Sequence, residues 1–319
     1  MHTLRNGLGS LLCLGVFTVA ASGLAASNIR SSAEEDRVVE RLESDPAKVV
    51  KDQDAGGGVT GARRLTLRFE DGEEIEVKWK PVPGSMDGWN NSPRKELAAY
   101  EIQRWFLDPP DHVVPTSVMR CLPLESVGAE KPSLEGSTCV LGAMEVWVHD
   151  VHIPEKIYDP KLFARDPVYA RHMADMNLVT YLIKHSDGRS NNFLLGNDPE
   201  NRRVFSIDNG ISFGAPVHNF FVKNWDTIRV PALRKESVDR LRAASPEDFE
   251  ELAVVVEMKL GADGVWRNAP KTTRRNPKDG AFLEDGMLQL GLTRSEIEAL
   301  IERRKDLLER VDEGEQKTF

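Results

Sequence analysis

The feature that most constrains this sequence is a hairpin pattern with polar residues at its open end, between His185 and Gly210. Two apolar runs, residues 193–195 and 204–207, are separated by turn-forming residues at 197–201, which predicts a β-hairpin. In an antiparallel pair, the start of the first strand lies beside the end of the second. The residues that flank the two runs should therefore lie side by side in the fold.

Three oxygen-bearing side chains occupy this open end: Asp187, Asn192 and Asp208. Carboxylate and amide oxygens are hard ligands suited to Mg²⁺ or Mn²⁺, so Asn192 and Asp208 are candidate metal ligands, with phosphate oxygens and water completing the shell. Asp187 could accept a proton from an attacking hydroxyl group. Taken alone, residues 208–210 would indicate an ordinary turn, because Asn-Gly is common in hairpin turns. Their spacing from Asp187 and Asn192 favours a metal site.

The residues before this segment predict a small sheet that carries one helix. A glycine cluster at 55–61 precedes two runs of alternating apolar and polar residues, which are joined at Asp71-Gly72 and end at Lys80. The other elements of this half are a helix at 94–106 and strands near 113–121 and 138–148.

The residues after 149 predict mainly helices. Residues 163–184 carry apolar side chains three or four apart, which is typical of a helix that faces a core. Ser245-Pro246 is a helix start, and residues 293–296 form a capping box before a final helix. Residues 261–280 are polar and basic, and we expect a loop there.

Four stretches resemble motifs of atypical protein kinases. Residues 187–192 look like their catalytic loop, D-R-H-x-x-N, although Gly188 departs from the usual Asp-Arg step and shifts Arg189 by one position. Residues 206–210 are similar to their metal-binding h-D-N-G or h-D-F-G motif. The other two are Trp79-Lys80-Pro81, which resembles their F-K-P strand, and residues 95–100, which resemble the E-x-A-A-[FY] of their lobe-bridging helix.

The sequence thus resembles the secretory-pathway kinases, the four-jointed and Golgi casein kinase group, and more distantly the phosphoinositide 3/4-kinases and HipA-type kinases. The resemblance covers residues 55–215. It implies an α+β, bilobal protein-kinase-like fold, with a small β-rich N-lobe carrying one helix at 55–148. A larger, mainly helical C-lobe would occupy 149–319.

The resemblance also implies residue roles in catalysis. Asp187 would be the catalytic base, and Asn192 and Asp208 would bind the metal. Arg189 would pair either with Asp187 or with phosphate. His185 would either brace the loop or touch substrate.

A second set of roles concerns the nucleotide. Lys80 would hold the phosphates and Glu96 would orient Lys80, with Lys78 and Glu101 as the alternatives. Residues 145–148 would be the hinge that touches adenine, through Glu145 and Val148. The backbone of Gly57 and Gly58 would cap the phosphates, because glycine permits close approach.

The first 26 residues predict a cleaved signal peptide. Leu8 to Ala26 is apolar and uncharged and ends in small residues, as a signal peptidase requires. Glycine and serine dilute the run, so a membrane anchor is the less favoured alternative, and we expect no stable span in the mature chain. Residues 27–54 are charged and lack a clear apolar stripe, and we expect a linker with one short helix at most.

Export changes the expectation for the cysteines. Cys13 would leave with the signal peptide, so Cys121 and Cys139 would remain in an oxidising compartment, where thiols often pair. We therefore expect a Cys121–Cys139 disulfide, with two separate buried thiols as the alternative.

Composition excludes several classes of protein. The 319 residues are 40% hydrophobic and 29% charged, which is enough for a core and argues against wholesale disorder or a polytopic membrane protein. The net charge of −9 makes general nucleic-acid binding a poor hypothesis, because that binding depends on Lys and Arg neutralising phosphates.

These observations together predict an exported, monomeric, ATP- and Mg²⁺- or Mn²⁺-dependent phosphotransferase. Its acceptor would be a hydroxyl group. A protein Ser/Thr, a sugar and a small molecule all remain possible acceptors, because the sequence of the loops that would contact the acceptor does not indicate which one binds. AMP transfer on the same fold is one alternative. A nucleotide-binding pseudokinase that acts as an interaction module is the other.

Overall fold

The computed structural model describes residues 31–319 except 57–60, 89–90, 215–223 and 277. The predicted signal peptide lies outside the described residues, as do Gly57 and Gly58. Within the described part of the chain, no helix is long and apolar enough to cross a membrane.

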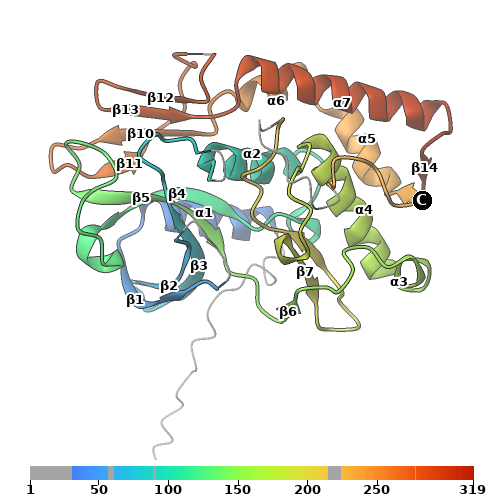
Figure 1. Ribbon diagram of the computed structural model, residues 1–319, viewed down its shortest axis with the longest axis horizontal. Helices are drawn as coiled ribbons and strands as arrows, with labels where there is room; N and C mark the ends of the chain where they lie inside the picture. The colour runs from blue at the N-terminus through green and yellow to red at the C-terminus, as the bar shows by residue number, and fades with distance from the viewer. Residues whose placement is uncertain (1–30, 57–60, 89–90, 215–223, 277) are drawn as a thin grey trace, which may run out of the picture.

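A five-stranded antiparallel sheet forms most of the first half of the fold (Figure 1). Its strands, in spatial order, are β1 (Ala47–Asp54), β2 (Arg63–Phe69), β3 (Glu74–Pro81), β5 (Cys139–Val146) and β4 (Ser117–Pro123). The β2–β3 hairpin turns where Asp71-Gly72 predicts it. Alternation along β3 places Val77 and Trp79 on one face and Lys78 and Lys80 on the other.

The two faces of this sheet are covered by α1 (Ser32–Ser44) and α2 (Pro93–Gln103). The helix expected within 27–54 is present as α1, whereas the linker prediction is wrong over residues 47–54, which form the edge strand β1, paired with β2. The apolar stripe of α1 is short because Val38 and Leu42 are its only buried apolar side chains. β1 is mostly exposed, so its sequence shows no alternation.

Helices and a small sheet follow residue 150. The helices are α3 (Pro160–Arg165), α4 (Pro167–Leu182), α5 (Lys235–Ala243), α6 (Pro246–Glu251) and α7 (Arg294–Asp312). The predicted hairpin is confirmed as β7 (Phe193–Gly196) and β8 (Val204–Ser206), with Phe193 opposite Ser206 and β6 (Val151–His152) on its edge. Single 3₁₀ turns occur at Pro109–Asp111, Leu124–Val127 and Ser190–Asn192. β9 (Ala232–Leu233) pairs in parallel with β14 (Lys317–Thr318).

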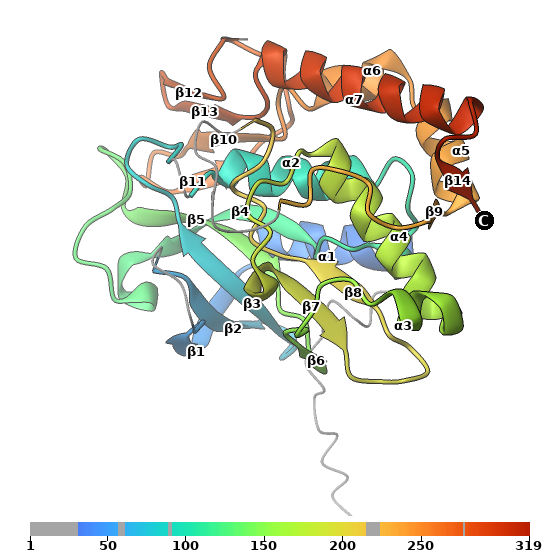
Figure 2. The ribbon, with the colours of Figure 1, turned by 45° about the vertical axis from the view of Figure 1, so that its right-hand side comes forward.

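The C-terminal third also contains a four-stranded sheet, which the sequence analysis did not predict. Its strands, in chain order, are β10 (Val256–Leu260), β11 (Trp266–Asn268), β12 (Ala281–Glu284) and β13 (Met287–Leu290). The expectation of a loop across 261–280 is thus wrong where β11 forms. Three to five residues are too few to show a clear period of two. The sheet lies beside the first sheet (Figure 2), where Asn268 Nδ2 donates to the carbonyl of Met119 at 2.9 Å.

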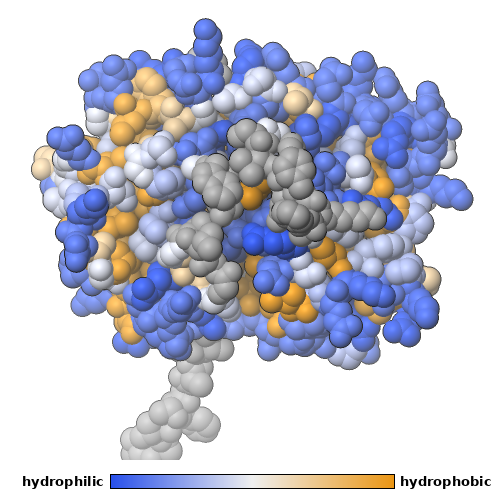
Figure 3. All heavy atoms as spheres, in the orientation of Figure 1, coloured by the Kyte–Doolittle hydropathy of each residue, from blue (hydrophilic) through white to orange (hydrophobic). Residues whose placement is uncertain are grey.

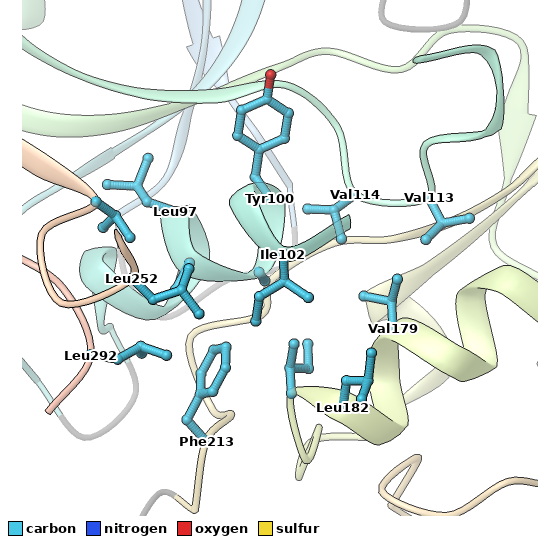
Figure 4. Packing of buried hydrophobic residues seen from close by; sticks show 14 of the residues in the cluster. Leu97, Tyr100, Ile102, Val113, Val114, Val179, Leu182, Phe213, Leu252 and Leu292 are labelled. Atoms are coloured by element: carbon cyan, nitrogen blue, oxygen red, sulfur yellow. The ribbon is translucent and has the colours of Figure 1, made fainter. Parts of the chain in front are cut away.

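Helix α2 lies at the centre of the larger apolar core. Ile102 of α2 lies on the side of Val179 and Leu182 of α4, and Leu97 lies near Leu252 (Figure 4). Leu252, Leu292 and Phe213 complete this contact, so segments from the last third of the chain touch α2 directly.

The predicted disulfide is present between Cys121 of β4 and Cys139 of β5, with the Cα atoms 5.6 Å apart. Both cysteines are buried in the core on the α2 side of the sheet. On the face drawn in Figure 3, hydrophilic side chains predominate, in keeping with the charged composition.

Candidate active site

Lys80 lies at the centre of a buried ion-pair cluster. Its Nζ is 3.0 Å from Glu96 Oε1 and 2.5 Å from Asp208 Oδ1. β3 supplies Lys80, α2 supplies Glu96, and the segment after β8 supplies Asp208. The side chain of Lys80 is 5% exposed, whereas that of Asp208 is 35% exposed. The structure thus brings together three residues that the sequence separates by up to 128 positions.

The turn after β8 is fixed by Glu96. The backbone N–H of Asn209 donates to Glu96 Oε2 at 2.6 Å, so both carboxylate oxygens of Glu96 are used. Asp208 has a φ of +60°, a left-handed conformation that non-glycine residues adopt only when their surroundings hold them there. A Cβ at Gly210 would meet Glu96 Oε1 at 3.2 Å, so glycine allows the close approach. Glu101, the alternative to Glu96, instead pairs with Arg104 at the surface.

The charges of this cluster reinforce one another. Burial would lower the pKa of Lys80, but the carboxylates of Glu96 and Asp208 outweigh burial and raise it above its ordinary value. Burial would likewise raise the pKa of Asp208, but the charges of Lys78 and Lys80 hold it well below its ordinary value. Asp208 is therefore ionised, as a metal ligand must be.

The segment before β7 places Asp187 and Asn192 next to each other. Asn192 Nδ2 donates to the carbonyl of Asp187 at 2.8 Å, and both residues are buried. Arg189 binds the Asp187 carboxylate through two nitrogens, with Nε to Oδ1 at 2.8 Å and Nη2 to Oδ2 at 2.5 Å. Of the two roles expected for Arg189, this structure shows the pair with Asp187.

His185 braces this segment from within the core. It is fully buried, and its ring lies 5.5 Å from that of Phe193. Burial lowers the pKa of His185 to about 4, so the ring is neutral near pH 7. A buried neutral ring packed on Phe193 supports the bracing role rather than substrate contact.

A cavity of about 770 Å³ opens beside the ion-pair cluster. Its wall includes residues of the predicted hinge, catalytic loop and metal-binding motif, together with Gly56 at the start of the glycine cluster, but not Lys80 or Glu96. The candidates on the wall are Glu145, Val148, Arg189, Asn192 and Asp208. A pocket of about 20 Å³ adjoins it and is lined by Lys78, Lys80, Glu96 and Glu145, whereas Asp187 lines neither hollow.

The cavity also contains a cluster that the sequence analysis missed. Arg64 lies over the ring of Trp147, with its guanidinium carbon 4.4 Å from the centroid, and pairs with Glu76 at 2.6 Å. His149 Nε2 lies 2.9 Å from the same carboxylate. The alternation of β2 and β3 put Arg64 and Glu76 on the polar face, but no motif marked them as site residues.

The oxygen atoms at the site suit a divalent cation that takes some of its ligands from the protein and the others from a nucleotide. Asp208 and Asn192 both line the cavity and offer the carboxylate and amide oxygens that Mg²⁺ and Mn²⁺ prefer. Among the described residues, no three His, Cys, Asp or Glu side chains gather so as to hold an ion. A metal here would therefore need oxygens from phosphate and water.

Comparison with known proteins identifies the fold. No model of a known protein family matches the chain, and no curated protein matches its sequence. The structure of hydra Fam20 with sugar is similar, with a TM-score of 0.54 and 14% identity over 91% of this chain and 93% of that chain. The Golgi casein kinase structure has a TM-score of 0.51 and 14% identity over 89% and 76%. This protein, a mixed α/β chain with several small sheets, has the fold of the Fam20 and Golgi casein kinase structures.

Proposed function

We propose that the protein is a kinase-type phosphotransferase that moves the γ-phosphoryl group of ATP to a hydroxyl acceptor. The observation that carries the proposal is Lys80 Nζ held between Glu96 and Asp208 at the edge of a cavity that Asn192 also lines. In this proposal residues 55–148 and 149–319 are the two lobes of a kinase. The chain would work after export, as a monomer.

Asp187 would act as the base. The acceptor hydroxyl oxygen forms a bond to the γ-phosphorus, its proton passes to the Asp187 carboxylate, and the bond to the leaving oxygen of ADP breaks. Arg189 now covers that carboxylate and would have to turn toward the phosphates to free it. Its side chain is 48% exposed, which leaves room for that movement.

The other residues would bind and position the donor. Mg²⁺ or Mn²⁺, when bound by Asn192 and Asp208, would neutralise charge on the phosphates. Lys80, fixed by Glu96, would add a positive charge at the same place. The backbone of Gly57 and Gly58 would cap the phosphates, and Val148 and Glu145 would border the base.

The test uses the purified chain with ATP and Mg²⁺ or Mn²⁺. We expect nucleotide plus metal to raise the melting temperature, because a ligand of the folded state stabilises that state. Mass spectrometry should then show an added mass of about 80 Da on an acceptor or on the protein itself, since phosphoryl transfer adds one phosphate group.

Two other outcomes would point elsewhere. An added mass of about 329 Da would indicate AMP transfer rather than phosphoryl transfer, since the group that moves differs. Binding of nucleotide without any modification, unchanged in Asp208→Ala, would indicate a pseudokinase that acts as an interaction module.

A further inference from the structure

Lys78 lies on the cavity wall, and the proposed function gives it no role. It is two residues before Lys80 on the same face of β3. Lys78 lines both the 770 Å³ cavity and the adjoining pocket. Lys80 lines the adjoining pocket but not the cavity. Lys78 therefore lies where the open cavity meets the pocket that Lys80 and Glu96 line.

The charge of Lys78 lacks a close carboxylate partner. Arg64 and Arg189, which share the cavity wall, are ion-paired with Glu76 and Asp187 at 2.6 and 2.5 Å. For Lys78, by contrast, no carboxylate oxygen of the described residues lies within 4.0 Å of Nζ. A half-buried ammonium without such a partner is a group that an anionic ligand stabilises.

The position of Lys78 in the sheet directs its charge toward the metal-binding aspartate. Its cross-strand neighbour on β5 is Glu145. Burial raises the pKa of Glu145 to about 7, so this carboxyl neutralises Lys78 only in part near neutral pH. Lys78 and Asp208 both line the cavity, so the ammonium lies at the same hollow as the carboxylate beside which phosphates would lie.

We propose that Lys78 is a second phosphate-binding lysine, which contacts the phosphate chain of the nucleotide directly. Lys80 is committed to Glu96 and Asp208 and is nearly inaccessible, whereas Lys78 faces the open cavity. The inference rests on the proposed function and divides the work between the two lysines. Lys78 binds the donor, and Lys80 holds the transferring group and Asp208 in position.

The experiment measures binding of ATP, ADP and adenosine, each with Mg²⁺, to the wild-type chain and to Lys78→Met by calorimetry. Methionine keeps an unbranched apolar stem and removes the charge. We expect ATP and ADP to bind at least tenfold more weakly, because a lost charge-assisted hydrogen bond exceeds the free energy of a tenfold change. Adenosine should bind as before, which also shows that the variant is folded, and Lys78→Arg should restore most of the ATP affinity.

Arg68→Met is the matched control. Arg68 lies on β2 of the same sheet, is 55% exposed and pairs with Glu74. Its loss should leave all three affinities unchanged.

The remaining outcomes overturn the proposal. An unchanged ATP affinity in Lys78→Met would exclude phosphate contact, and equal weakening of all three ligands would place Lys78 at the base or ribose. If the wild-type chain binds none of the three, the proposed nucleotide-dependent function itself fails, and the role of Lys78 fails with it.

Discussion

Arg94 of α2 and Glu296 of α7 form a bidentate, largely buried ion pair between residues that are 202 positions apart in the sequence. Arg94 Nη1 donates to Glu296 Oε2 at 2.5 Å, and Nη2 donates to Oε1 at 3.0 Å. Arg94 is 6% exposed, and it lies two residues before Glu96. The C-terminal helix thereby holds the helix that positions the candidate catalytic lysine.

Arg94→Met should therefore destabilise the protein and impair the site. Without Arg94, the largely buried carboxylate of Glu296 loses both of its hydrogen bonds to the guanidinium and keeps Lys95 at 3.5 Å, so we expect a loss of about 3 kcal/mol in the free energy of unfolding. At temperatures where the variant is folded, kcat should fall more than KM changes, because Glu96 loses its support. Urea denaturation and steady-state kinetics measure the two effects.

Arg294→Met provides the control for this prediction. Arg294 is also on α7, but its pair with Glu250 is exposed on both sides, and we expect a change below about 0.5 kcal/mol. The double variant Arg94→Met with Glu296→Met should lose less stability than the two single variants added together, since the charge that each single change leaves behind is also removed. Part of the loss should remain, because Asp87 loses its pair with Arg94 and Lys95 loses its pair with Glu296. A double variant as unstable as the sum of the single variants would show that the pair is not coupled.

The Cys121–Cys139 disulfide should stabilise the sheet measurably. It closes a short loop, with a sequence separation of 18, for which the chain-entropy model gives about 3 kcal/mol. The double variant Cys121→Ser with Cys139→Ser should therefore unfold at lower urea concentration than the oxidised wild type. Fully reduced wild type should behave like the variant. Identical midpoints for oxidised and reduced wild type would contradict the prediction.

Gly142→Ala tests the packing of the same sheet. An ideal Cβ at Gly142 would lie 1.9 Å from Nε1 of Trp79, which is 3% exposed. The indole cannot remain in place, so we expect a loss of about 2 kcal/mol. Gly84→Ala, where nothing lies within 4 Å of the added Cβ, should change little. Trp79→Leu combined with Gly142→Ala should cost less than the two changes added, and strict additivity would show that the two residues do not compete for space.

The candidate site could be predicted from the sequence because its residues flank local elements. Asn192 and Asp208 border one hairpin, and the hairpin alone makes them neighbours. Lys80 ends a strand with clear alternation. Cys121 and Cys139 are the two cysteines that would remain after cleavage of the predicted signal peptide. In each of these cases the prediction depends only on pairing between segments close in the sequence or on the number of cysteines.

The rest of the fold depends on partners that lie far away in sequence. Glu35 of α1 is buried because His112 Nδ1 lies 2.8 Å from its carboxylate. A glutamate is rarely buried, so the residue type alone would predict a surface position. The strands from Val256 to Leu290 are short, pair with one another and lie against the first sheet, so no local periodicity marks them. The capping box at Glu296 was visible, but its second role, binding Arg94, required the tertiary structure.

Glu145→Gln should change how stability depends on pH. Burial raises the pKa of Glu145 to about 7, while the charge of Lys78 opposes burial only in part. Between the ordinary pKa of 4.5 and about 7 the folded state therefore binds more protons at this group than the unfolded state. The free energy of unfolding is therefore least affected by this carboxyl group below pH 4.5. It falls as the pH rises toward 7, because the buried carboxyl group must then ionise.

Glutamine mimics the protonated acid, so the variant lacks this cost. We expect Glu145→Gln to match the wild type at pH 4 and to be more stable at pH 8, by at most about 3 kcal/mol. Urea midpoints at half-unit pH steps would show the difference growing across this window. A Glu145→Gln difference that stays constant from pH 5 to pH 8 would mean that Glu145 is ionised throughout and does not titrate in the fold near neutrality.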